Sequence, residues 1–69
     1  AMINGMVHRL AAELEAQPDN PQGWGRLIRA YTVLGDQAAR DAAVARAQAL
    51  FKERPDAMRA VQAAAEGRQ

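Results

Sequence analysis

The sequence has 69 residues, neither cysteine nor serine, and nine basic against eight acidic residues, for a formal net charge of +1. Without cysteine there is no disulfide framework, thiolate zinc site or cysteine nucleophile, and the balanced charge disfavours nucleic acid as a partner. No apolar run reaches the roughly 18 residues of a membrane span. Much of the 49% hydrophobic fraction is alanine, the strongest helix former, so the composition favours a small all-α domain.

The first predicted helix covers residues 3–17. Met6, Leu10 and Leu14 recur four residues apart, and Ile3 and Val7 lie beside them, which predicts one apolar stripe along a helix. Pro18 biases the residue before it away from helical backbone angles, so we expect the helix to end there.

A second helix is predicted over residues 21–34. Asn20 followed by Pro21 is typical of an N-cap with proline at the first helical position, and Gly35 suits the left-handed conformation that ends many helices. Large apolar residues recur inside this segment at spacings of three and four, namely Trp24, Leu27, Ile28, Tyr31 and Leu34. We therefore expect one buried face, with both aromatic rings in the core.

Two further helices are predicted over residues 37–54 and 56–66. Asp36 is placed to cap the first of them, and Pro55 with the aspartate after it repeats the Pro-Asp signal found earlier in the chain. Such short connections force neighbouring helices to be antiparallel. The sequence thus predicts a stack of antiparallel helical hairpins in one domain over residues 1–69, and its abrupt helical start favours a segment of a larger protein.

The spacing of Trp24, Leu27 and Tyr31, followed by Gly35 between two helices, resembles the tetratricopeptide repeat. The resemblance implies a right-handed superhelix fragment of about four helices, made of one complete repeat and two halves. Ile28 departs from the pattern, because glycine usually stands at that position and lets two helices approach each other.

The run from Met6 to Trp24, continued through Gly35 to Phe51, is similar to the periplasmic repeat region of bacterial cytochrome c biogenesis proteins of the CycH type. This resemblance implies a protein-binding module whose repeats hold the C-terminal helix of apocytochrome c for haem attachment. It also implies a periplasmic location in a parent protein anchored to the inner membrane. The segment itself does not exclude the cytoplasm.

The candidate binding surface is the face of the second helix opposite its aromatic side, because those positions match the ones that line the concave groove of tetratricopeptide arrays. The residues proposed for it are Gln22, Gly25, Arg26, Arg29, Thr32 and Val33. With two arginines, this surface suits an amphipathic helix that carries acidic side chains. The alternative interpretation is an ordinary solvent-facing surface.

No combination of residues indicates catalysis, a cofactor or a metal. His8 is the only histidine, Glu13 and Glu15 face different directions on a helix, and Thr32 has no base near it in sequence. We therefore expect a module that binds a protein or peptide helix, and not an enzyme. Two alternatives stay open: a scaffold repeat of another assembly complex, and a self-association module that forms a homodimer through exposed apolar ends.

Overall fold

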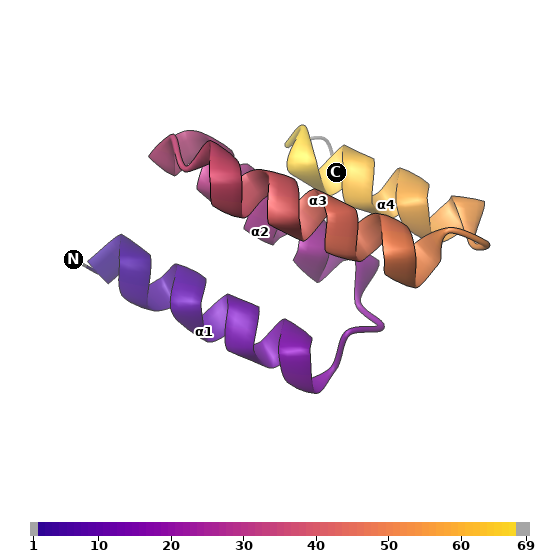
Figure 1. Cartoon of the computed structure of the whole chain (residues 1–69), viewed down its shortest axis with the longest axis horizontal. Coiled ribbons are helices and arrows are strands. Elements are labelled where there is room, and N and C mark those ends of the chain that lie inside the picture. Colours follow the sequence, from indigo (N-terminus) through magenta and orange to yellow (C-terminus); the bar gives the residue numbers. More distant parts are fainter. Residues whose placement is uncertain (1, 68–69) are drawn as a thin grey trace.

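The computed structural model describes residues 2–67 of the chain, with side chains described from residue 5 onward. Over that range it contains no strand and four helices, which are α1 (Met2–Ala16), α2 (Pro21–Leu34), α3 (Gln37–Phe51) and α4 (Pro55–Ala65). Successive helices run in opposite directions, as the colours of Figure 1 show. The predicted all-α fold of antiparallel hairpins is confirmed.

Caps fix both ends of α2. The side chain of Asn20 accepts a hydrogen bond from the N–H of Gly23 (3.1 Å), and Pro21 takes the first helical turn, where its missing N–H costs nothing. At the other end Gly35 adopts the left-handed conformation (φ 77°), and its N–H donates to the carbonyl of Thr32 (3.1 Å). These local signals explain why the observed bounds of this helix equal the predicted ones.

The third helix is shorter than the sequence pattern predicts. It ends at Phe51 instead of Arg54, and α4 begins at Pro55 instead of Asp56. Arg54 precedes a proline, whose ring disfavours helical angles, and it adopts φ −129° and ψ 81°. The first helix ends at Ala16, one residue before its predicted end, because the next residue also precedes a proline.

The second helix is the centre of the arrangement. It packs closely against α3 and α4 and more loosely against α1. Within the described residues the backbone of α1 does not come close to that of α3 or α4, and Figure 1 shows it set apart from both. The molecule therefore has a closely packed three-helix body, α2–α4, and an N-terminal helix held mainly by one neighbour.

Buried apolar residues from all four helices form the core. They are Val7, Leu14, Trp24, Leu27, Ile28, Ala43, Ala47, Phe51, Ala57, Val61 and Ala64. Trp24 is 3% exposed and its Nε1 donates a hydrogen bond to the carbonyl of Pro18 (2.9 Å), which confirms the predicted core position of the indole. Met6 is 72% exposed, so the predicted apolar stripe is wrong at that residue, and Val7 takes the buried position.

Candidate functional site

Four of the six predicted binding residues form an exposed stripe on α2. We call this stripe the outer α2 face, and its residues are Gln22, Arg26, Arg29 and Val33. They recur at helical spacing on the side of the helix opposite the buried ring of Trp24. Val33 is 73% exposed, so this face presents an apolar group among charged and polar ones.

The two arginines of the outer α2 face have no acidic partner within residues 2–67. Ion pairs of 3.0 Å or shorter are made instead by Arg40, Arg46, Arg54 and Arg59. A guanidinium carries five N–H donors, and an external carboxylate can accept two of them at once. As far as the described residues go, Arg26 and Arg29 therefore have donors that a carboxylate of a partner can accept.

The surroundings of these two arginines differ. A Cβ atom built on Gly67 would lie 2.8 Å from Nη1 of Arg29, so this guanidinium lies against the backbone just after the end of α4. The carbonyl end of a helix carries partial negative charge and attracts cations. Arg29 thus contributes to the packing of α4. Arg26 is exposed and forms no ion pair within residues 2–67, and it is our first candidate for contact with an external ligand.

Gly25 is not part of the exposed surface, and its prediction as a binding residue is wrong. It is buried against α4: a Cβ atom at this position would lie 2.5 Å from both the Cβ of Ala64 and the carbonyl oxygen of Val61. A glycine inside a helix often marks a close approach of two backbones, and this signal was present in the sequence. The close helix contact therefore occurs at Gly25, and not at Ile28, where the repeat pattern has glycine.

Thr32 is exposed, but its hydroxyl is used within the helix. Its Oγ1 donates a hydrogen bond to the carbonyl of Ile28 (2.9 Å), one turn earlier. Only the methyl group and the lone pairs of the hydroxyl oxygen remain for a partner. Thr32 is therefore a weaker candidate contact than its exposure suggests.

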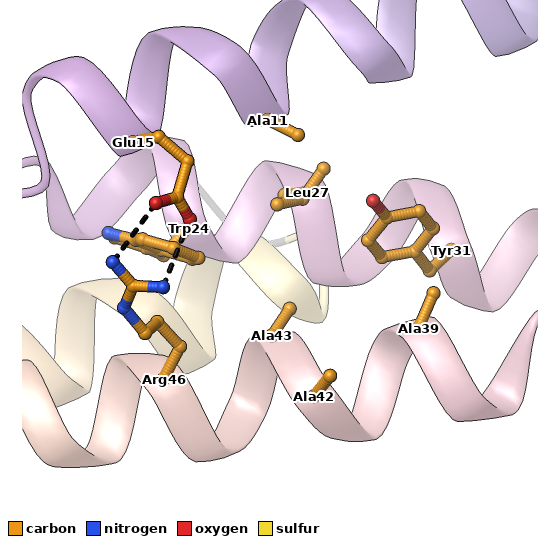
Figure 2. A pocket seen from close by; sticks show the side chains of 9 residues that line it. All are labelled: Ala11, Glu15, Trp24, Leu27, Tyr31, Ala39, Ala42, Ala43 and Arg46. Carbon is orange, nitrogen blue, oxygen red and sulfur yellow. Dashed lines mark hydrogen bonds and ion pairs between the residues drawn. The ribbon is translucent and has the colours of Figure 1, made fainter.

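A hollow that the sequence analysis missed lies between α1 and α3, on the other side of α2. We call it the α1–α3 cleft; it has a volume of about 240 Å³ and is lined by Ala11, Glu15, Trp24, Leu27, Tyr31, Ala39, Ala42, Ala43 and Arg46. Figure 2 shows that α2 supplies the large apolar and aromatic side chains of this cleft. The two flanking helices contribute alanines, together with Glu15 and Arg46. Tyr31 is only half-buried at this cleft, so the prediction of a core position for it is correct only in part.

An ion pair joins the two walls of this cleft. Nη1 and Nη2 of Arg46 on α3 donate hydrogen bonds of 3.0 and 3.1 Å to the two carboxylate oxygens of Glu15 on α1. The guanidinium also lies 5.8 Å from the ring centroid of Trp24, which gives a cation–π contact (Figure 2). Sequence reasoning could not find this pair, because its members lie on different hairpins and only the folded chain brings them together.

The described residues give no sign of a metal centre or a membrane-crossing element. Within residues 2–67, histidine and the acidic side chains form no group of three or more that would hold a metal ion. In the same range, no helix combines the length and the apolar character that crossing a bilayer requires. The expectation that the chain is not an enzyme stays a prediction.

Two curated proteins are similar to part of this chain. It is 54% identical over 37 residues to the cytochrome c-type biogenesis protein CycH of Bradyrhizobium diazoefficiens, and 51% identical over 43 residues to CycH of Rhizobium meliloti. These segments cover 54% and 61% of this chain but only 10% and 11% of the relatives. No protein-family model matches the chain, and no solved structure matches it.

Proposed function

We propose that this chain is a helical-repeat module of the tetratricopeptide kind that binds a polypeptide helix during cytochrome c biogenesis. The partner is the C-terminal helix of apocytochrome c, which the module holds for haem attachment without itself making or breaking bonds. The outer α2 face receives this helix. The proposal includes a periplasmic location, in a parent protein anchored to the inner membrane.

The observation that carries the proposal is a pair of arginines that form no ion pair within residues 2–67, beside an exposed valine. Arg26 and Arg29 supply charge-assisted hydrogen bonds, and Val33 supplies an apolar contact on the same stripe. An amphipathic helix with apolar and acidic residues at helical spacing complements that combination. The assignment to cytochrome c biogenesis rests on the similarity to two CycH proteins.

A calorimetric titration with a synthetic peptide of an apocytochrome c C-terminal helix tests this proposal. Arg26→Glu should weaken binding about tenfold or more, because a contact worth about 1.4 kcal/mol becomes a repulsion. Arg29→Glu should act in the same direction and should also lower the melting temperature, because this side chain lies against the backbone just after the end of α4. Addition of salt should reduce the effect, since exposed charges are screened.

Arg59→Glu is the matched control, because it makes the same charge change on α4 at a side chain that is 76% exposed. Its affinity for the peptide should stay within about twofold of the unaltered chain, as expected of a charge outside the contact. Equal losses in the Arg26 and Arg59 variants, or an unchanged affinity after Arg26→Glu, would remove the outer α2 face from the proposal.

Two other functions remain as competing proposals. The module can serve as a scaffold repeat in a different assembly complex, in which case apocytochrome peptides bind no better than unrelated amphipathic helices of the same charge. It can also self-associate, and the exposure of Met6 and Val33 supports that alternative. Light scattering over a range of chain concentrations distinguishes self-association from peptide binding.

A further inference from the structure

We infer that the α1–α3 cleft is a second protein-binding site, which accepts one aliphatic side chain of a partner helix and holds a carboxylate of that same helix at Arg46. This goes beyond the proposed function, because the cleft and the outer α2 face lie on different sides of α2. The two sites share no residue.

The size and lining of the cleft select an apolar side chain as its main occupant. Its volume of about 240 Å³ is below the roughly 300–1,000 Å³ of pockets that enclose a cofactor or a drug-sized molecule. The lining is mostly apolar: the ring of Trp24 and the side chain of Leu27 come from α2, and alanines come from both walls (Figure 2). A single leucine-sized side chain fits such a hollow better than a polar ligand.

The polar groups of the cleft lie at its two ends. Arg46 stands beside Trp24, and Tyr31 lies two helical turns further along α2 (Figure 2). The seven residues between these ends span about 10 Å, so a partner helix can place an aliphatic residue over Leu27, between the two ends, and an acidic residue one turn away, near Arg46. Within residues 2–67 the hydroxyl of Tyr31 makes no hydrogen bond.

Charge complementarity identifies the second group of the occupant as a carboxylate. Glu15 accepts one hydrogen bond from each of Nη1 and Nη2 of Arg46, which leaves the remaining N–H donors of the guanidinium without an acceptor among the described residues. Both side chains are well exposed, at 47% for Arg46 and 59% for Glu15. An exposed pair of this kind exchanges partners at little cost, so Glu15 competes with a carboxylate of the partner.

Trp24 is the only tryptophan of the chain and lines the cleft, so its fluorescence reports occupancy directly. The probe is an alanine-rich helical peptide that carries one leucine and, four positions later, one glutamate. We expect a saturable change in Trp24 emission. Replacing the glutamate of the peptide by glutamine should weaken its binding by up to about fivefold, as loss of one exposed ion pair predicts.

Ala42→Leu fills the cleft from an exposed position of α3 and should reduce peptide affinity at least tenfold without unfolding the chain. Ala45→Leu is the matched control, because this residue is exposed on the same helix but does not line the cleft. Glu15→Gln should increase the affinity for the acidic peptide, since it removes the competing carboxylate. A purely structural role of the ion pair would predict the opposite result.

Several outcomes would overturn the inference. They are the absence of a saturable response, equal affinities in the Ala42 and Ala45 variants, weaker binding after Glu15→Gln, and a Trp24 signal that follows chain concentration without peptide. The last result would mean that a second copy of the chain occupies the cleft. Arg26→Glu should leave the binding of this probe unchanged, because Arg26 does not line the cleft. The proposed binding at the outer α2 face can therefore fail while this inference holds, and the reverse.

Discussion

The two sides of α2 differ in how closely the neighbouring helix approaches. On the α4 side, Gly25 leaves no room for even a methyl group, since Ala64 and Val61 already occupy that space. On the α1 side, the neighbour lies further away, and a cleft with an exposed ion pair remains open between it and α3. Close backbone packing makes a rigid body, whereas a loosely packed helix leaves room for a ligand and for motion.

Several separate contacts hold α1 in place despite this looser packing. Leu14 is 1% exposed and packs into the core, and the indole of Trp24 is hydrogen-bonded to the segment that follows α1. Two ion pairs also connect this part of the chain to the other hairpin. One joins Glu15 to Arg46, and the other joins Asp19 to Arg54 at 2.8 Å. Exposed ion pairs contribute little to the free energy of folding, so the burial of apolar side chains of α1 accounts for most of its attachment.

The largest effect is expected at Trp24, which is buried in the core and also lines the α1–α3 cleft. Trp24→Ala should cost about 3–5 kcal/mol, which is comparable with the entire stability of so small a domain, roughly 3–10 kcal/mol. We expect this variant to be unfolded at room temperature. Circular dichroism during heating measures this, and a cooperative transition with native helicity would contradict the central role of the indole.

An intermediate effect is expected on the closely packed side. Gly25→Ala should destabilise the fold by about 1–3 kcal/mol, because overpacking outweighs the higher helix propensity of alanine. Gly5→Ala on α1 is the matched control: nothing lies within 4 Å of a Cβ atom there, so it should stabilise the chain by up to about 1 kcal/mol. Urea denaturation of both variants gives the comparison, and equal shifts would mean that α4 packs less tightly than the structure shows.

The smallest effect is expected on the open side. A double-mutant cycle over Glu15→Gln and Arg46→Gln should give a coupling free energy of about 0.2–1 kcal/mol, as for other exposed ion pairs. High salt should reduce this value further. A coupling well above that range, measured from denaturation curves at low and high salt, would show that the pair holds α1 in place and does not exchange easily with a ligand.

Local signals account for the parts of the fold that could be predicted. Asn20 with Pro21, and Gly35 with Asp36, act through backbone hydrogen bonds to residues a few positions away, so the second helix was predicted with its correct bounds. The end of α3 was predicted too late, because the lysine, glutamate and arginine that follow Phe51 are good helix formers, while the constraint on Arg54 comes from the proline after it.

The candidate site was less predictable, because it depends on which helix faces which. Helical spacing, together with the resemblance to tetratricopeptide arrays, placed Arg26 and Val33 on the exposed side of α2, as the structure has them. The same reasoning placed Gly25 there, although α4 covers it. Helical spacing predicts the face of a helix on which a residue lies, but it does not predict which other helix covers that face.

By itself, therefore, the sequence determined four helices, the caps at both ends of α2 and at the start of α3, and the burial of the indole, since these features arise from local hydrogen bonding and the period of a single helix. Only the tertiary structure decided that Gly25 contacts α4 and that Glu15 meets Arg46 across a hollow above Trp24. Contacts between distant segments depend on how far apart the helices settle. That distance is set by the combined volumes of side chains from several helices, which no local pattern records.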